Sequence, residues 1–463
     1  YYSSSDEYPT LVNPYSNQRR MIYINLDAAR PGTSSYYALL AHELQHAAHF
    51  NFDPGEEVWV NEGLSTLAEE IEDRRVLWPE LFRGEPDTQL TGWSPVPGAS
   101  GPHYGAAYLF LKYLQEHYGG QDPGNATKAL VSEPADGVEG INAFLRDLGH
   151  DVDFDEVFRD WTIANYLDDP KGGRYGYMDG EFRLSATERI AEYKSVSGTV
   201  HQYAADYVSV NLKKGGARIV FQGSPRARLL SNEAHSGRWQ WWSNRGDAID
   251  STLTREVDLT GVRQASLNFW VWYDIEDGFD YAYVEASTDG GVTWDILRGR
   301  NSTAESPVGN SFGFAYTGVS GGGNDPKWVP ESVDLSDYAG KVVLLRFQYV
   351  TDEAVNTPGL AIDDISIPEI GLLDDVEEDG GWEARGFVRI DNLLPQRFFV
   401  QVIQIGDETR VMEVPLTPQQ RGELRVSQFG GAVKEVVLVI AAATPVTGEP
   451  ATYQVSVEPL SSE

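Results

Sequence analysis

One short helix-forming run constrains this chain more than any other feature: residues 42–46 read His-Glu-x-x-His within an apolar helical pattern. Side chains four residues apart on a helix share a face, so His42 and His46 can bind one metal ion together. Glu43 lies beside that face and can reach a water molecule on the metal. Two imidazoles with an adjacent glutamate predict a zinc site in which Glu43 is the general base.

A run of this kind also occurs by chance on solvated helix faces. Here the flanking residues are mainly Tyr, Leu and Ala, which are too apolar for a surface helix. The chain has only eight histidines, and three of them, His42, His46 and His49, fall within eight residues. These observations favour a metal site. His49 is a rival ligand, although its spacing favours packing or the orientation of another ligand.

A catalytic zinc ion takes three protein ligands and keeps one position for water. Glu62 is the candidate third ligand, because it opens a second helical pattern and fifteen residues separate it from the first motif. Glu69 lies seven residues later on the same face and is a candidate to orient a ligand imidazole. A metzincin pattern is excluded, since it requires Gly in place of His49 and His in place of Phe52.

Residues 59–69 read Trp-Val-Asn-Glu-Gly-Leu-Ser-Thr-Leu-Ala-Glu, a run that resembles the third-ligand helix of gluzincin metallopeptidases. Membrane alanyl aminopeptidases and hyicolysin-type peptidases have a similar Trp-x-Asn-Glu-Gly run. The resemblance implies that Glu62 is the third zinc ligand, after a loop that is short for the thermolysin-like group. It also implies that a Tyr or His at the start of a later helix stabilises the oxyanion. His103 and Tyr104, which open the apolar pattern over residues 103–114, are the candidates.

Composition excludes several classes of protein. The formal net charge of −34 argues against nucleic acid or an anionic membrane as a partner. The chain has no cysteine, so disulfides and thiol catalysis are excluded. No apolar run approaches the length of a membrane span. The chain starts with Tyr rather than Met, and we expect a processed, secreted, extracellular bacterial protein that is a monomer.

Helical patterns dominate the first part of the chain and β patterns the rest, and its length suits roughly three domains. The expected fold class is multidomain α+β: a mainly helical zincin-like catalytic domain, then a jelly-roll β-sandwich and a second small β domain. Residues 21–26 are predicted to form a strand that binds substrate backbone or belongs to the core. The expected domains are 1–196 (catalytic), 197–227 (strands pairing with the C-terminal domain), 228–372 (jelly roll) and 373–463 (C-terminal β domain).

Short pieces of the third segment resemble the jelly-roll domain of immune inhibitor A, a secreted bacterial metallopeptidase. They include Trp-Trp-Ser-Asn-Arg-Gly-Asp at 241–247, Ser-Thr-Asp-Gly-Gly at 287–291 and Ala-Ile-Asp-Asp-Ile at 361–365. Such jelly rolls often direct carboxylates towards a structural Ca²⁺, which takes six to eight oxygen ligands. A solvated acidic rim is the alternative. The candidate calcium ligands are Asp247, Asp250, Asp363 and Asp364.

Together these features predict a zinc-dependent endopeptidase that acts on extracellular proteins or peptides, with Zn²⁺ as catalytic and Ca²⁺ as structural cofactor. In this mechanism Glu43 takes the proton of a water whose pKa the zinc lowers. An aminopeptidase-type exopeptidase is one alternative, but the sequence lacks the Gly-x-Met-Glu-Asn loop typical of those enzymes. A non-catalytic adhesin or carbohydrate-binding protein is another, and the intact motif residues argue against it.

Overall fold

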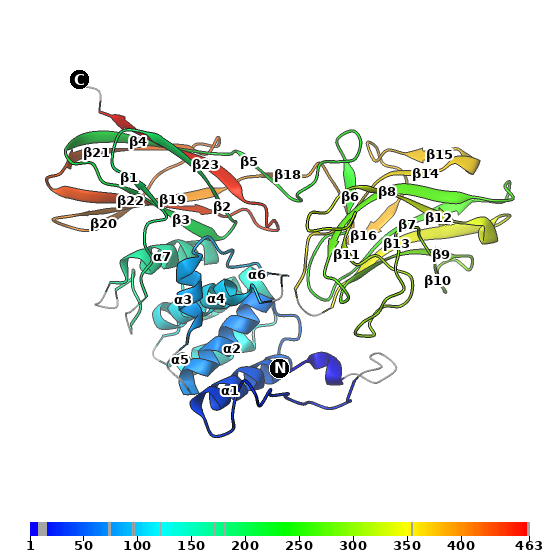
Figure 1. The fold of residues 1–463 in the computed structure, drawn as a ribbon, viewed down its shortest axis with the longest axis horizontal. Coiled ribbons are helices and arrows are strands. Elements are labelled where there is room, and N and C mark those ends of the chain that lie inside the picture. Colours follow the sequence, from blue (N-terminus) through cyan, green and yellow to red (C-terminus); the bar gives the residue numbers. More distant parts are fainter. Residues whose placement is uncertain are drawn as a thin grey trace. The chain divides into compact units, whose positions relative to one another are not determined.

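The computed structural model describes residues 1–7, 16–72, 76–94, 96, 98–120, 122–169, 173–178, 182–352 and 355–460. The chain divides into two compact units (Figure 1). The first comprises Tyr1–Tyr2, Ile22–Leu229 and Leu394–Glu463, and the second comprises Ser3–Met21 and Leu230–Leu393. The first unit therefore holds both ends of the chain, and most of the second is an insertion in its sequence.

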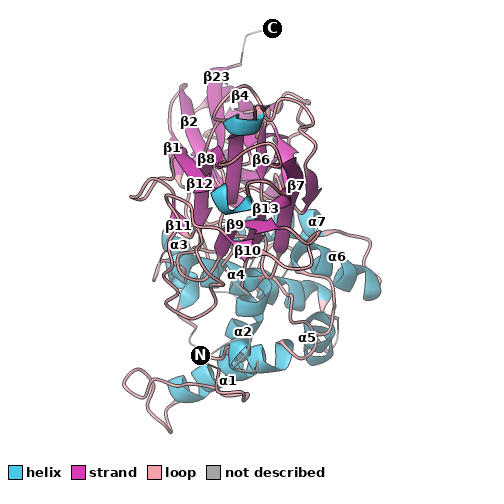
Figure 2. Ribbon diagram, turned by 90° about the vertical axis from the view of Figure 1, so that its right-hand side faces the viewer, coloured by secondary structure: helices cyan, strands magenta, loops and turns pink. Residues whose placement is uncertain are grey.

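Helices form the N-terminal part of the first unit, drawn in cyan in Figure 2. Residues 78–102 are rich in Pro and Gly, a composition that predicts a loop, but they contain the short helix α3 (Trp78–Gly84), with a proline in its first turn. The predicted strand over residues 21–26 is wrong, because only Ile22 forms a bridge there, with Tyr2. The helices are α1 (Ser34–His49), α2 (Val58–Glu72), α3 (Trp78–Gly84), α4 (Gly101–Tyr118), α5 (Pro123–Val131), α6 (Gly137–Asp147) and α7 (Phe154–Leu167).

Close packing of α2 against α4 depends on a glycine beside the candidate ligand. A Cβ atom on Gly63 would lie 2.7 Å from Leu111 Cδ1 and 3.0 Å from the carbonyl oxygen of Ala107. A side chain at this position would force Leu111 to move and would press on the main chain of Ala107, so glycine favours this close approach of the two helices. The Asn-Glu-Gly run thus combines a metal-ligand candidate with a packing requirement.

A seven-stranded sheet completes the first unit, in the order β2-β23-β4-β21-β22-β19-β20. It joins strands from residues 195–223 with strands from residues 398–459, on either side of the insertion. The helical core continues into this sheet through Ile403, Val437, Val439 and Ala441. Its strands are β2 (Ser195–Val200), β4 (Gly215–Gly223), β19 (Phe398–Gly406), β20 (Arg410–Glu413), β21 (Arg421–Phe429), β22 (Val433–Ala442) and β23 (Ala451–Pro459).

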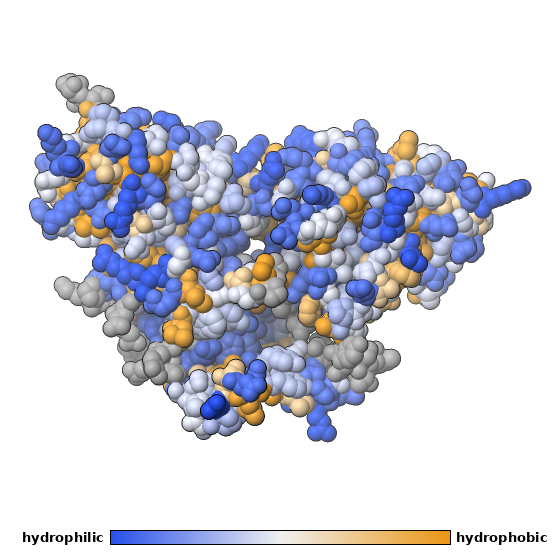
Figure 3. Space-filling view, viewed as in Figure 1, coloured by the Kyte–Doolittle hydropathy of each residue, from blue (hydrophilic) through white to orange (hydrophobic). Residues whose placement is uncertain are grey.

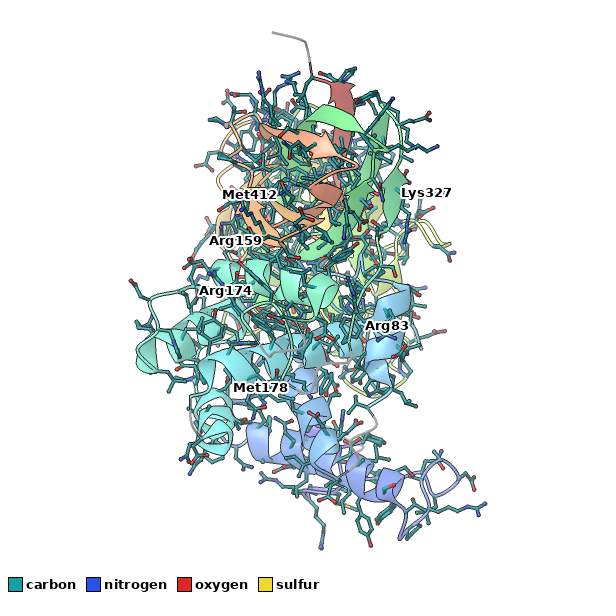
Figure 4. All side chains as sticks on the ribbon, turned by 90° about the vertical axis from the view of Figure 1, so that its left-hand side faces the viewer. Arg83, Arg159, Arg174, Met178, Lys327 and Met412 are labelled. Atoms are coloured by element: carbon teal, nitrogen blue, oxygen red, sulfur yellow. The ribbon has the colours of Figure 1, made fainter. Side chains whose placement is uncertain are left out.

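Figure 4 shows the side of this unit where α7 meets the sheet, with Arg159, Arg174 and Met412 labelled. Arg159 Nη1 lies 3.0 Å from Glu413 Oε1, at the end of β20. Arg174 Nε lies 2.5 Å from Asp160 Oδ2 on α7. Ion pairs thus rim the apolar junction. Separate two-stranded sheets are formed by β1 (Glu188–Ile190) with β3 (Ala204–Val210) and by β5 (Arg226–Arg228) with β18 (Leu393–Pro395).

The second unit is a β-sandwich, and along β13 (Val342–Val350) fully buried residues alternate with less buried ones. One sheet has the order β10-β9-β13-β7-β16. Its strands are β7 (Asp250–Asp258), β9 (Tyr281–Ser287), β10 (Asp295–Ile296), β13 (Val342–Val350) and β16 (Glu383–Arg385). The side chains between the sheets include Phe269, Phe347 and Trp382.

The other sheet has the order β11-β8-β14-β6-β17, with β12 beside β8 and β15 beside β14. Its strands are β6 (Gln240–Trp242), β8 (Ser266–Ile275), β11 (Gly318–Val319), β12 (Val329–Asp334), β14 (Gly359–Ile367), β15 (Leu372–Asp374) and β17 (Val388–Ile390). Because β16 and β17 pair inside the sandwich, its end lies beyond the boundary expected at residue 372. The described residues also form the short 3₁₀ helices η1 (Ser4–Glu7), η2 (Ser336–Tyr338) and η3 (Pro368–Ile370).

The visible surface is mainly hydrophilic, with apolar residues in small groups (Figure 3). Within the part of the chain that the structure describes, no helix combines the length and apolar character needed to span a bilayer.

Candidate metal centre and active site

Three predicted ligands converge between α1 and α2. His42 Nε2 lies 3.0 Å from His46 Nε2. Glu62 Oε2 lies 3.2 Å from the Nε2 atom of His42 and 3.5 Å from that of His46. The i, i+4 spacing on α1 supplies the two imidazoles, and the first turns of α2 bring the carboxylate opposite them.

The three donor atoms fit a zinc ion. Tetrahedral ligands at zinc bond lengths of about 2.0–2.1 Å are separated from one another by about 3.3 Å, close to the separations found here. Glu62 Oε2 is buried and accepts no hydrogen bond. Two imidazoles and one carboxylate also form a donor set of catalytic zinc, which leaves a fourth position for water.

Each imidazole is oriented through its other nitrogen. His42 Nδ1 lies 2.7 Å from Glu69 Oε1, at the position the sequence suggested for this carboxylate. His46 Nδ1 lies 3.0 Å from Asn61 Oδ1 and 3.1 Å from Ser65 Oγ. Such contacts fix the tautomer and direct Nε2 towards a metal. Neither partner of His46 was predicted from the sequence, although Asn61 immediately precedes Glu62 in the motif.

The charges of this group favour binding of a cation. Burial lowers the pKa of His42, but the carboxylates of Glu62 and Glu69 outweigh that effect and raise it to about 9. Burial raises the pKa of Glu62, while the facing imidazoles lower it to about 2. A proton therefore neutralises this pocket when no other cation does, and zinc has to displace that proton.

Glu43 is buried, with 7% of its surface exposed, and is approached by main chain. The N–H of Tyr2 donates a 2.6 Å hydrogen bond to Glu43 Oε2. Residues 1–2 also pair with residues 22–23, since the Tyr23 N–H donates a 2.8 Å hydrogen bond to the carbonyl oxygen of Tyr1. An extended peptide can thus lie along residues 22–23 with an amide at Glu43.

The two oxyanion candidates differ in what they face. Tyr104, in the first turn of α4, packs between Trp78 and Trp93, each with its ring centroid 4.8 Å away. Its ring centroid lies 6.3 Å from that of His42. Burial, followed by the charge of Glu62, raises the pKa of Tyr104, so its hydroxyl stays a proton donor.

His103 instead directs Nδ1 to the carbonyl oxygen of Gln89 at 3.2 Å, and burial lowers its pKa. The structure thus places Tyr104, and not its neighbour, beside His42 and Glu62. His49, the rival ligand, is fully buried and lies outside the group formed by His42, His46 and Glu62.

The predicted calcium ligands do not come together. Among the described residues, none of the four belongs to a group of metal-ligand size. Asp363 and Asp364 face the segment before β6, because a bulge follows Asp363 and Asp364 has a φ of 48°. Asp247 and Asp250 have separate partners near the start of β7. The contacts are Asp363 with Ser236, Asp364 with His235 and Ser236, Asp247 with Asn356, and Asp250 with Gln348.

A different acidic group lies in the sandwich, formed by Glu276, Asp280 and Asp352. Asp280 is fully buried, and burial raises its pKa to about 8. It accepts a 2.9 Å hydrogen bond from the N–H of Asp352. This group was not predicted from the sequence, because Asp352 is more than seventy residues from the turn that holds Glu276 and Asp280.

Comparisons with known proteins agree with this architecture. Residues 205–392 match the family model described as "Immune inhibitor A-like, MAM domain". Pre-pro-metalloprotease PrtV of Vibrio cholerae is 30% identical over 168 residues, which are 36% of this chain and 17% of that protein. Immune inhibitor A of Bacillus thuringiensis subsp. alesti is 28% identical over 286 residues, 55% of this chain and 39% of that protein.

Bacillopeptidase F of Bacillus subtilis is 28% identical over 106 residues, 22% of this chain and 6% of that protein. The chain spans less than half the length of each of these relatives. The matches identify a bacterial metallopeptidase-like architecture that includes an immune inhibitor A-like domain. A structure of infectious bursal disease virus (Gt strain) aligns with 60% of this chain and 70% of its own at 11% identity, and its TM-score of 0.14 carries no argument.

Proposed function

We propose that this chain is a secreted zinc endopeptidase that hydrolyses peptide bonds of extracellular proteins. The observation that carries the proposal is the convergence of His42, His46 and Glu62 beside Glu43, with a peptide N–H hydrogen-bonded to Glu43. The gluzincin-like motif, the metalloprotease relatives and the zinc-like donor separations support it. The high negative charge and the lack of cysteine suit an extracellular monomer.

The proposed mechanism assigns a separate task to each side chain. A bound zinc ion would polarise the substrate carbonyl and acidify a water molecule. Glu43 accepts the proton of that water and delivers it to the leaving amine. Tyr104 donates its hydroxyl proton in a hydrogen bond to the developing oxyanion. Glu69 and Asn61 hold the two imidazoles in place.

The main chain of residues 22–23 has a role in substrate binding in this proposal. The hydrogen bond from Tyr23 N–H to the carbonyl oxygen of Tyr1 supports this role. The terminal ammonium of Tyr1 also lies 3.3 Å from Glu43 Oε1, so this contact is compatible with cleavage within a chain and with cleavage at its end. One assay distinguishes an endopeptidase from an exopeptidase and from a non-catalytic binding protein.

That assay uses casein and an internally quenched peptide blocked at both ends, together with an unblocked aminoacyl substrate. The proposal predicts cleavage of casein and the blocked peptide, loss of cleavage on chelation, and recovery when zinc is restored. Cleavage of the aminoacyl substrate alone would identify an exopeptidase. No cleavage by the zinc-loaded protein would support a binding function instead.

A further inference from the structure

A second group of metal-ligand size lies at the junction between α1 and α2. It consists of His49, the last residue of α1, Asp53 in the connecting loop, and Glu56 just before α2. One donor atom from each residue lies within 4.8 Å of the others. All three side chains are more than nine-tenths buried, with exposed fractions of 0%, 6% and 7% respectively.

The polar atoms of this group are incompletely satisfied. His49 Nε2 and Asp53 Oδ2 are buried and have no hydrogen-bond partner. The remaining atoms hold the side chains in place: Asp53 Oδ1 accepts from the N–H of Gly55 at 3.3 Å. Glu56 Oε1 accepts from the N–H of Gly137 at 2.8 Å. Buried polar groups without partners are costly and rare in proteins, and a missing ligand is one explanation for them.

We propose that His49, Asp53 and Glu56 bind a second divalent transition-metal ion, of which zinc is the natural probe. Imidazole together with carboxylates suits Zn²⁺ and its first-row neighbours, whereas Ca²⁺ and Mg²⁺ prefer oxygen ligands alone. Two carboxylates balance the charge of a divalent ion. Such an ion gives a partner to both orphan atoms.

The position of this group gives the ion a structural role next to the candidate active site. Asn61 Oδ1 lies 3.2 Å from His49 Nδ1 and 3.0 Å from His46 Nδ1. Fixing His49 thus fixes Asn61, which in turn orients His46. Glu56 extends the link to the first residue of α6 through Gly137. The second ion ties the loop between the two ligand helices to the helix beside it.

The alternative is a group without metal, in which a protonated Glu56 shares its proton with Asp53. The two states differ in metal content, so metal analysis of the full chain, prepared in zinc and dialysed, decides between them. We expect two zinc ions per wild-type chain and one in Asp53→Asn, which keeps the size and the acceptor used by Gly55. Glu56→Gln serves as a second variant if Asp53→Asn does not fold. The matched control, Asp151→Asn at an exposed site, keeps two.

A Glu62→Ala background separates this inference from the proposed function. There we expect one remaining zinc ion, and a melting temperature that is higher in zinc than in chelator. The double variant Asp53→Asn/Glu62→Ala should hold no zinc and show no such difference. One zinc ion in wild type and in Asp53→Asn, with none in Glu62→Ala, would overturn the second site and leave the proposed function intact.

Discussion

The candidate zinc centre and the acidic group of the sandwich are two solutions to the burial of charged ligands. In the helical region, two imidazoles come from one helix, and each has a partner on its other nitrogen. In the sandwich, Glu276 and Asp280 come from one turn and Asp352 from a distant segment, and all three are acidic. In the first group an imidazole can take the balancing proton, whereas the second has only carboxyl groups and needs protons on them or a cation.

The two groups differ in the protonation of their buried carboxyl groups. The pKa of Glu62 falls to about 2 because imidazoles face it, while burial raises the pKa of Asp280 to about 8. A carboxylate held ionised serves as a ready ligand. A carboxyl group held protonated makes the stability of its domain depend on pH and on cations.

The largest expected effect is at the general base. Glu43→Gln keeps the size of the side chain but cannot accept the proton of water, and such a loss typically costs 10²–10⁴-fold in rate. Zinc content should stay at the wild-type value, because Glu43 is not a ligand. Peptidase rates and elemental analysis check both statements, with Glu72→Gln at an exposed site as the matched control. An active Glu43→Gln protein with bound zinc would refute the mechanism.

The next effect separates two neighbouring residues of α4. Tyr104→Phe removes the hydroxyl that faces the metal ligands, and loss of one oxyanion donor costs about 10²–10³-fold in kcat. His103→Gln should change kcat only a few-fold, because His103 contacts the carbonyl oxygen of Gln89. Steady-state kinetics of both zinc-loaded variants tests this contrast. The reverse order of effects would assign the oxyanion to His103.

A smaller effect is expected for the support of His42. Glu69→Gln weakens the contact to His42 Nδ1, and changes of this kind typically cost 10–100-fold in metal affinity or activity. Zinc titration against a competing chelator measures the affinity. Equal affinities of wild type and Glu69→Gln would show that this contact does not orient the imidazole.

The smallest effect concerns the sandwich. The pKa of Asp280 in the folded protein lies above its ordinary value of 3.8, so the folded state binds the extra proton. Stability is therefore expected to fall as the pH rises from about 4 to 8 in chelator. Ca²⁺ should raise the melting temperature at pH 8 more than at pH 5, because it compensates the ionised carboxylates.

Asp280→Asn should remove both effects, and Asp325→Asn at an exposed position should leave them unchanged. Calorimetry of the full chain, in which the unfolding of the sandwich is followed, makes the measurement. A calcium response that survives in Asp280→Asn would place the ion away from this acidic group.

Sequence predicted the parts of the site that depend on local spacing. His42 and His46 share one face of α1, and Glu62 and Glu69 share one face of α2. Within each helix, helical geometry alone places the two side chains together. The Tyr104 side chain faces His42 because it packs between Trp78 and Trp93, and this packing could not be predicted from the sequence.

In the sandwich, too, the sequence predicted local features but not the contacts between distant segments. Apolar and alternating runs indicated its strands. Which aspartates lie close together depends instead on contacts between segments that are distant in the sequence. The boundary expected at residue 372 was wrong because β16 and β17 return to pair with β7 and β6. The short helix α3 was missed because its surroundings are rich in proline and glycine.

The central claim is that His42, His46 and Glu62 hold a zinc ion. An anomalous difference map from crystals of the full chain, measured at the zinc absorption edge, tests it most directly. The account predicts a peak bounded by the Nε2 atoms of His42 and His46 and by the carboxylate of Glu62. A zinc-loaded crystal without a peak there, or with His49 in place of Glu62 as the third ligand, would contradict it.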